Sequence, residues 1–588
     1  MKKRILCLFL AIFMLVGTCA ALTACGGDGD KDCTHVNEDA DGKCDKCGET
    51  IKHKHKDDDE DGKCDVCSKD MSEEEEVIEY PWADDDPVEL LFQMTHNSDV
   101  SQNPSGCERY LAGEDPNAIE EIDDMVADRN SEAEYETNVA PVYQYYLDVD
   151  EYGWGECIEK ILTIVNSGTT KDAPDVYCNF TYDLVGASLK GAFANLKNTE
   201  LKNGNYFEFL DEDYDETVDN RGYMYDYMNS TTLSQEKVYI LASDYFLDLI
   251  RSFFIVPVNI KLLESVDDPL LTVDKNGDGV FTIDDFYEEV KEKKWTYNKV
   301  AAYSAAIYEN TGEANPAEDI EDVLGFAVGW GGVFASGVIY STDITIISKE
   351  WDDSKGDYVY DYPTDSPQLY ELFDNLSTLV NSTGVAVIKS GADVNKYGSD
   401  CRIAVRNRFC DNKVLFGSII LVGALEYEAY QKLKGSSGFG VVPVPLYHEV
   451  AADSTETYLT SIHNNARPGA IAKNTQHFAE CTAFLNYQST HSNDILNKYY
   501  NENLQYNIAG GASGTVEMLQ YIRLNVRSAF DKTFEDAIGV FNADQSSRWH
   551  HILSVNDYDH DIRADYQSKI STKKERIQTL YNEYPKLP

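Results

Sequence analysis

The sequence predicts an α/β fold in which strands and helices alternate along the chain. After Pro87 it changes from an acidic segment to short apolar runs that alternate with helical patterns. Such alternation is typical of a parallel sheet covered by helices. We therefore expect a folded body over residues 87–588, preceded by an acidic stalk and a leader. The first expected strands cover residues 88–94, 142–146 and 175–178, and the first expected helices cover residues 157–165 and 184–196.

Local patterns justify these elements in order. Residues 88–94 form an apolar run that ends at a polar turn, which indicates a buried strand. Asp115 and Pro116 supply a helix cap and a first-turn proline ahead of apolar residues at helical spacing. Residues 157–165 place four apolar side chains on one helical face, and Gly168 follows as a stop signal. The remaining strands are short apolar runs of the same kind.

The charge of the chain limits its partners. It has 588 residues with 103 Asp and Glu against 50 Lys and Arg, which gives a formal net charge of −53. A surface this acidic repels phosphate groups, so we expect no nucleic-acid partner and no electrostatic docking on anionic lipids. The hydrophobic content of 43% is high enough for packed cores and excludes general disorder.

The amino terminus predicts export. Three basic residues after Met1 precede an apolar run over residues 5–22, and small residues then lead to Cys25. This order predicts a cleaved signal over residues 1–24 and not an anchor helix. Leu22-Thr-Ala-Cys25 also resembles the bacterial lipobox, which implies cleavage before Cys25, lipid attachment to its sulfur and a place on the outer face of the cell membrane. An ordinary secretory signal with an incidental cysteine is the alternative.

The stalk, residues 25–86, contains a repeat with a period of 20 residues. The segments 33–47 and 53–67 each carry a Cys or His at offsets 0, 2, 11 and 14. Four such ligands with a Cys-x₂-Cys knuckle suit tetrahedral zinc, and a segment this polar would need a metal to fold. A disordered acidic stalk and disulfide bonding outside the cell are the alternatives. The expected zinc ligands are Cys33, His35, Cys44, Cys47, His53, His55, Cys64 and Cys67.

A second metal motif lies inside the body. Residues 274–285 read Asp-Lys-Asn-Gly-Asp-Gly-Val-Phe-Thr-Ile-Asp-Asp, which matches a twelve-residue calcium loop. Aspartate in place of glutamate at the twelfth position shortens the reach of the last ligand. We expect a structural calcium ion; the alternative is an acidic turn without metal. The expected ligands are Asp274, Asn276, Asp278, the carbonyl of Val280 and Asp285.

Candidate ligand contacts follow the strands. Ligands of parallel sheets bind at the carboxyl ends of the strands, where Asn97, Tyr182 and Asp183 are expected. Trp330 lies between glycines, which could leave its ring open to a cleft. Aromatic faces with nearby carboxylates and amides suit carbohydrate, although core packing is as good an interpretation of each residue alone. Trp295 precedes the expected helix cap Thr296, which favours a structural role.

Several segments together resemble the extracellular solute-binding proteins of ABC importers, of the large carbohydrate-binding type. Their order along the chain carries the resemblance, which covers most of residues 88–584. A clean Trp-Trp pair, present after the first lobe in many relatives, is missing here, so the resemblance leaves the aromatic platform and the sugar open. The matching segments are 123–130, Ala173-Pro-Asp-Val-Tyr177 with Tyr182-Asp183, Trp295-Thr296, 409–416, Gly438-Phe-Gly-Val-Val-Pro-Val-Pro-Leu446, 517–523 and the last helix 568–584.

The resemblance implies a two-lobe fold of the periplasmic-binding-protein type (type II). A hinge crossed about three times would join the lobes, with an oligosaccharide in the cleft and a membrane permease as partner. It implies a first lobe of about 87–245 and 400–450, and a second lobe of about 246–399 and 451–588.

The sequence shows no common catalytic motif, so we expect a binding protein and not an enzyme. A surface lipoprotein that binds or cleaves glycans without transport is the alternative. Cys401 and Cys410 could form a disulfide across a short loop, which the sequence leaves open.

Overall fold

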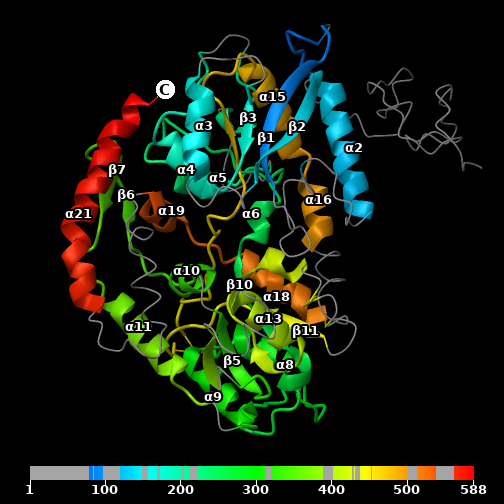
Figure 1. Cartoon of the computed structure of the whole chain (residues 1–588), viewed down its shortest axis with the longest axis vertical. Coiled ribbons are helices and arrows are strands. Elements are labelled where there is room, and N and C mark those ends of the chain that lie inside the picture. The colour runs from blue at the N-terminus through cyan, green and yellow to red at the C-terminus, as the bar shows by residue number, and fades with distance from the viewer. Residues whose placement is uncertain are drawn as a thin grey trace, which may run out of the picture. The chain divides into compact units, whose positions relative to one another are not determined.

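The computed structural model divides the chain into two units, Met1–Ala83 and Asp84–Pro588 (Figure 1). In the first unit the structure describes only a short turn around residues 81–83. The second unit contains all the helices and strands discussed below. The structure describes residues 78–83, 85–96, 111, 120–148, 156–167, 173–200, 204–211, 222–312, 319–329, 332–388, 401–426, 429–430, 433, 438–451, 453–500, 513–537 and 562–587.

The first sheet has four strands in the order β12-β3-β1-β2. Strands β1, β2 and β3 are parallel, with Leu91 opposite Val142 and Phe92 opposite Val176. Strand β12 runs antiparallel to β3. The parallel order confirms the arrangement expected from alternating strands and helices. The strands are β1 (Val88–His96), β2 (Val139–Asp148), β3 (Val176–Cys178) and β12 (Gly469–Ile471).

Helices bury their apolar faces around this sheet. Ile161 and Val165, on the apolar face expected for residues 157–165, are fully buried. On the sheet itself, the ring of Phe92 contacts that of Phe484 at 5.7 Å between centroids. The helices are α2 (Glu120–Thr137), α3 (Glu156–Asn166), α4 (Thr181–Ser188), α15 (Phe478–Thr490) and α16 (Asn493–Lys498).

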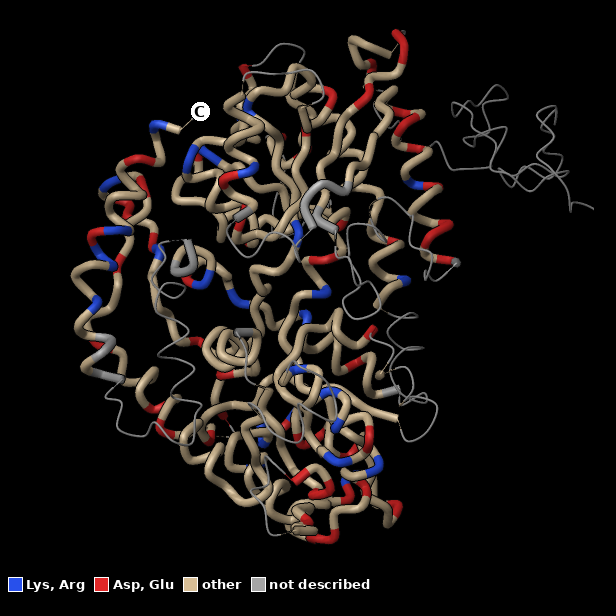
Figure 2. The backbone as a smooth tube through the Cα atoms, in the orientation of Figure 1, with Lys and Arg blue, Asp and Glu red and all other residues tan. Residues whose placement is uncertain are grey.

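Part of the acid excess lies on α2 (Figure 2). Its only basic residue, Arg129, is buried, and the guanidinium lies 4.8 Å from the centroid of the Tyr245 ring. Acids therefore face water along this helix while the one cation packs inward, which agrees with the solvating role expected for the negative charge.

The second sheet has six strands in the order β10-β4-β9-β5-β8, with β11 also paired to β4. Strands β5, β8 and β9 are parallel to one another, whereas β4 is antiparallel to its three partners. The strands are β4 (Phe254–Asn259), β5 (Leu324–Gly329), β8 (Val385–Ile388), β9 (Val414–Phe416), β10 (Ile420–Leu421) and β11 (Phe439–Val442).

Several helices accompany the second sheet. Trp295, which ends the loop before α9, is buried against Phe286 and donates from its indole nitrogen to the carbonyl of Pro443 at 2.9 Å. This confirms its expected structural role. The helices are α7 (Ile260–Leu263), α8 (Ile283–Lys291), α9 (Tyr297–Ile307), α10 (Gly332–Tyr340), α11 (Pro367–Val380), α13 (Cys401–Cys410) and α18 (Ser513–Arg523).

Three described segments lie side by side where the chain passes between the sheets. Phe253 pairs with Ile462, and Thr460 pairs with Val526. The amide of Phe254 donates to the Thr460 hydroxyl at 3.0 Å. We call the first sheet with its helices the first lobe and the second sheet with its helices the second lobe. The expected two-lobe α/β fold is thus confirmed.

The expected limits of the lobes are wrong after residue 400. Residues 400–450 were assigned to the first lobe, but β9 and β11 pair with β4 and β5 in the second sheet. In the range 451–588, assigned to the second lobe, β12 joins the first sheet. The reason is physical: a short apolar run can pair with either sheet, and only long-range contacts decide which.

A hairpin and the last helices form a further layer against the first lobe. Within the described ranges, strands β6 (Ser348–Asp352) and β7 (Asp357–Asp361) pair only with each other. Lys349 donates to the carbonyls of Asn229 and Thr232 at 2.9 and 2.8 Å. Tyr360 lies between the rings of Phe530 and Tyr581, from α19 (Phe530–Ala537) and α21 (Ile562–Glu583).

Two expectations about helices need correction. The helix expected over 184–196 is α4, which ends at Ser188, because the chain turns at Gly191 with a φ of 73°. Cys401 and Cys410 form no disulfide. They lie at the two ends of the ten-residue helix α13, which places their Cα atoms about 14 Å apart, beyond the ~7 Å that a disulfide allows.

Candidate functional site

A buried polar cluster lies at the carboxyl end of β3. The strand ends at Cys178, and Asn179 and Phe180 then lead into α4. Asn179 is 1% exposed, and its Oδ1 accepts a hydrogen bond from the amide of Phe180 at 2.6 Å. Its Nδ2 atom has no hydrogen-bond partner among the residues that the structure describes. An unpaired buried amide is costly unless a ligand or water completes it.

The crossing segment 460–467 lies beside this strand end. The amide of Thr181 donates to the carbonyl of Ala466 at 2.9 Å. The Oδ1 atom of Asn465 is buried and likewise finds no hydrogen-bond partner in the described part of the chain. The ring of His463 packs against Phe254, and its Nδ1 accepts from the amide of Asn465 at 3.0 Å. The cluster therefore joins a strand end of the first lobe to a segment between the lobes.

The side chains of Asn179, His463 and Asn465 are neutral, and the cation of Lys532 lies near His463. Burial, and then the nearby cation of Lys532, hold the pKa of His463 well below its usual range, so its imidazole is neutral at pH 7. Asn179 offers an amide donor and Asn465 an amide acceptor. Neutral donors and acceptors at the end of a parallel strand suit a hydroxyl-bearing ligand better than a charged one. We call Asn179, His463 and Asn465 the amide cluster.

Two of the four expected ligand residues, Tyr182 and Asp183, lie in the first turn of α4, which begins at Thr181. Tyr182 is half-buried, and its amide lies 3.5 Å from the carbonyl of Asn464. Asp183 is 1% exposed in the first turn of α4. Asn97 and Trp330 lie outside the described residues.

Sequence reasoning missed the amide cluster itself. Asn179 directly follows the expected strand 175–178, so the rule that selected Tyr182 could also have selected it. His463 and Asn465 carry no comparable signal. They reach the site because residues 460–463 pair with the segment before β4, a contact between positions about 200 residues apart in the chain.

The expected calcium loop is turned in the manner that its sequence predicts. The amides of Gly277 and Gly279 donate to the two carboxylate oxygens of Asp274 at 2.6 and 2.7 Å. Asn276 and Asp278 each accept from an amide two residues further on. Gly277 and Gly279 have φ values of 79° and 88°, which other residues rarely adopt. These side chains present the oxygen donors that calcium prefers.

Asp285, the twelfth residue of the loop, is engaged within the protein. Its Oδ1 accepts from the amides of Lys275 and Asn276 at 2.9 and 3.3 Å. Its Oδ2 accepts from the amide and hydroxyl of Thr282 at 2.8 and 2.9 Å, which completes a capping box at the start of α8. A cation that used this carboxylate would have to replace some of these bonds. Among the described residues, no three His, Cys, Asp or Glu side chains gather as a metal site.

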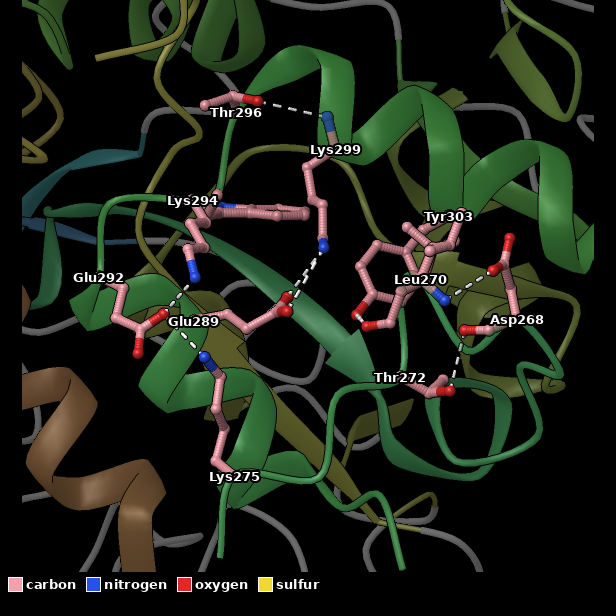
Figure 3. A network of polar contacts seen from close by, with 12 residues as sticks. Asp268, Leu270, Thr272, Lys275, Glu289, Glu292, Lys294, Thr296, Lys299 and Tyr303 are labelled. Atoms are coloured by element: carbon pink, nitrogen blue, oxygen red, sulfur yellow. Dashed lines mark hydrogen bonds and ion pairs between the residues drawn. The ribbon is translucent and has the colours of Figure 1, made fainter. Parts of the chain in front are cut away.

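Ion pairs fix the loop to the helices beside it (Figure 3). Lys275 pairs with Glu292 at 2.8 Å, and Lys299 of α9 pairs with the buried Glu289 of α8 at 3.1 Å. The hydroxyl of Tyr303 donates to the carbonyl of Leu271 at 2.7 Å. The first contact ties the start of the loop to the residue that follows α8, and the other two join α9 to α8 and to the segment before the loop.

The remaining metal and lipid predictions lie outside the described residues. Cys25 belongs to this group, as do all eight expected zinc ligands between Cys33 and Cys67. They stay predictions. No helix in the described part of the chain combines the length and apolar character needed to cross a membrane.

A cavity of about 410 Å³ lies at the opposite edge of the first sheet. It is lined by Glu89 and Leu91 of β1, Asp175 before β3, and residues 474–477 after β12. These residues mark the amino ends of the parallel strands, whereas ligands of such sheets bind at the carboxyl ends. We therefore place the candidate site at the amide cluster and not at this cavity.

Comparison with protein-family models and with curated proteins finds no match. Solved structures do match. A galacto-N-biose/lacto-N-biose I-binding protein of an ABC transporter from Bifidobacterium longum, solved with lacto-N-biose, is 12% identical over 84% of this chain and 98% of its own, with a TM-score of 0.48. An ABC substrate-binding protein from Listeria monocytogenes, solved with cycloalternan, is 13% identical over 84% and 99%, with a TM-score of 0.45.

The GacH receptor of Streptomyces glaucescens, solved unliganded and with acarbose, is 13% identical over 85% and 98%, with a TM-score of 0.41. At these identities the matches place no ligand in this chain.

Proposed function

We propose that the protein is the lipid-anchored, extracellular substrate-binding subunit of an ABC importer. It binds a carbohydrate, in our proposal an oligosaccharide, between its two lobes and delivers it to a membrane permease without changing it chemically. The observation that carries the proposal is the amide cluster, where unpaired neutral groups at a strand end meet the segment that crosses between the lobes. Both the order of motifs along the sequence and the two-lobe fold support it.

A carbohydrate ligand fits this chemistry. Asn179 supplies a donor and Asn465 an acceptor, and the half-buried Tyr182 lies three residues after Asn179 in the chain. Sugar hydroxyls can pair with both amides at once, and an aromatic ring can cover the C–H face of a sugar. His463 is neutral, so it places no charge at the site. A hydroxyl-rich ligand could not compensate such a charge.

The test is ligand-induced thermal stabilisation of the full mature chain across a panel of oligosaccharides, with product analysis of the same mixtures. We expect one class of sugar to raise the midpoint of unfolding and to be recovered intact. Cleaved sugar would favour the alternative, a glycan-cleaving surface lipoprotein. If no carbohydrate raised the midpoint, the ligand class would be wrong.

We further propose that Cys25 carries the lipid anchor. The small residues before it and the basic, apolar leader support this. Replacing Cys25 with Ala should move the protein from the membrane fraction to the medium. Retention of the variant in the membrane fraction would contradict the proposal.

We also propose a structural calcium ion at residues 274–285. The oxygens of Asp274, Asn276 and Asp278 around the two left-handed glycines support it. Calcium would then be held by these side chains, the carbonyl of Val280 and Asp285. A chelator should lower the unfolding midpoint of the wild-type chain but not that of Asp278→Ala. An equal midpoint with and without chelator in the wild type would contradict a bound cation.

For the stalk we propose two zinc-binding repeats, 33–47 and 53–67. The identical offsets of their Cys and His residues support this. Under reducing conditions the full chain should bind two zinc ions per molecule beyond any ion at residues 274–285. Replacing Cys47 and Cys67 with Ser should abolish that binding, and unchanged stoichiometry in this variant would contradict the proposal.

A further inference from the structure

Four buried charged side chains form a continuous chain between the lobes. Arg467 pairs with Asp248 at 2.7 Å, and Asp248 also pairs with Arg251. Arg251 makes two parallel hydrogen bonds to Glu426, at 2.9 and 2.8 Å. All four side chains are at most 8% exposed. Because the two cations and two anions compensate one another away from water, they act as one unit, which we call the charge chain.

The members of the charge chain come from different parts of the fold. Arg467 precedes β12 in the first lobe, and Asp248 and Arg251 belong to α6 (Asp248–Arg251), which ends two residues before Phe253, the residue that pairs with Ile462. Glu426 ends the short helix η3 (Val422–Glu426), which follows β10 of the second sheet. The charge chain therefore spans the point where the lobes join.

One end of the charge chain reaches the candidate site. The guanidinium of Arg467 lies 4.6 Å from the centroid of the Phe180 ring, and Phe180 directly follows Asn179 of the amide cluster. Arg467 also lies two residues beyond Asn465 in the chain. A ligand that forms hydrogen bonds with both amides would thus contact the two segments that position Arg467.

The other end holds the second lobe to the first. Glu426 accepts a hydrogen bond from the hydroxyl of Tyr499 at 2.6 Å, and Tyr499 directly follows α16 of the first lobe. Rotation of the lobes about the crossing segments would separate Glu426 from Tyr499 and would open its pair with Arg251 to water. The compensated charges therefore favour the arrangement in which the lobes lie together.

We propose that the charge chain couples the ligand site to lobe closure, with Arg467 and Glu426 as positioning residues at its two ends. The proposal rests on the proposed function and adds a regulatory element to the same site. For a ligand that binds the closed arrangement, the apparent dissociation constant rises as the fraction of ligand-free molecules that are closed falls. Removing the charge of Glu426 should lower that population and so weaken binding at a site that Glu426 does not touch.

The test compares Glu426→Gln with Glu289→Gln in the full mature chain. The control is matched, because the side chains of Glu289 and Glu426 are both 3% exposed and Glu289 pairs with Lys299 inside the second lobe only. We expect Glu426→Gln to raise the dissociation constant of the bound oligosaccharide about tenfold. It should also raise the ligand-free radius of gyration in X-ray scattering. Glu289→Gln should change neither.

Equal dissociation constants for Glu426→Gln and wild type would overturn the coupling, as would equal effects of the two variants. If no carbohydrate bound the wild-type chain, the proposed function would be wrong. The hinge role is tested separately: equal ligand-free radii of gyration for wild type and Glu426→Gln would overturn it. Should Glu426→Gln fail to fold, Tyr499→Phe removes a single hydrogen bond and must shift binding and radius in the same direction.

Discussion

Asp285 shows how much a single carboxylate contributes at the residue scale. It accepts four hydrogen bonds from the calcium loop and from the first turn of α8. Burial of this carboxyl raises its pKa, but the hydrogen bonds from Lys275, Thr282 and Asn276 together lower the pKa further than burial raises it. The ionised form is therefore the one that stabilises the fold.

Replacing Asp285 with Ala should lower the free energy of unfolding by about 2 kcal/mol, the upper range for a lost helix cap. The neighbouring Asp284 is exposed, so Asp284→Ala serves as the control and should change stability by less than about 0.5 kcal/mol. Because the folded pKa of Asp285 is depressed, its contribution should be complete above the unfolded pKa and lost as pH falls through the folded value. Urea unfolding of both variants with chelator present measures this, and equal stabilities would contradict it.

Asp244 has the opposite environment. Burial raises the pKa of its carboxyl to about 6. The nearby Arg523 and a hydrogen bond from Asn493 act in the opposite direction but do not cancel this effect. The folded state therefore holds a proton between about pH 4 and pH 6 that the unfolded state has lost, and stability should fall as pH rises through this window. Asp244→Asn should remove that slope, whereas the exposed Asp226→Asn should keep it. A slope unchanged in Asp244→Asn would show that another group is responsible.

Residue-scale features were predictable only where a local pattern encodes them. Thr296 accepts from the amide of Lys299 at the start of α9, as its position before a helical pattern indicates. The amide cluster was not predictable, because Asn465 and His463 look like any polar loop residues until long-range pairing brings them to β3. The same holds for Glu426, whose partner Arg251 is 175 positions away.

At the scale of elements, the hairpin β6–β7 contacts the first lobe through the half-buried Lys349. The ammonium of Lys349 lies 4.3 Å from the centroid of the Tyr358 ring and 5.2 Å from that of Phe530, between two backbone carbonyls of the first lobe. Burial lowers its pKa to about 7, and the charge of Asp357 opposes this shift. Docking of the hairpin is therefore linked to the loss of a proton near neutral pH.

The free energy of unfolding should rise between pH 7 and pH 9, because the unfolded lysine keeps a proton that the docked lysine gives up. The slope contributed by Lys349 should approach about 1.4 kcal/mol per pH unit. Lys349→Met should remove this contribution, whereas Lys355→Met, on the exposed turn of the same hairpin, should not. Urea denaturation at several pH values measures it, and parallel pH profiles for wild type and Lys349→Met would contradict it.

Of the three scales, individual strands and helices were the easiest to predict from the sequence. The runs at 88–94, 142–146 and 175–178 are all strands, because each combines an apolar sequence with a clear turn signal. Their parallel direction was implied by the alternation with helices. The sheet to which β9, β11 and β12 belong was not, because a strand of three or four residues carries too little pattern to select its neighbour.

At the scale of the whole molecule, two lobes share a junction that holds both the amide cluster and the charge chain. The junction consists of segments that are hundreds of residues apart in sequence and adjacent in space. A ligand there would contact both the end of β3 and a crossing segment. The fold thereby links ligand binding to the relative orientation of the two lobes. The negative charge of −53 does not extend to the amide cluster, whose named groups are neutral.

The most direct test of the central claim is calorimetric titration of the full mature chain with oligosaccharides, with Asn179→Ala and the exposed Asn497→Ala as a matched pair. We predict that one class of oligosaccharide binds the wild type and is recovered intact. Asn179→Ala should weaken binding about tenfold for one lost hydrogen bond, while Asn497→Ala binds as the wild type does. Asn465→Ala should behave like Asn179→Ala. Absence of binding by every carbohydrate, or equal affinity in Asn179→Ala and Asn497→Ala, would contradict a carbohydrate site at the end of β3.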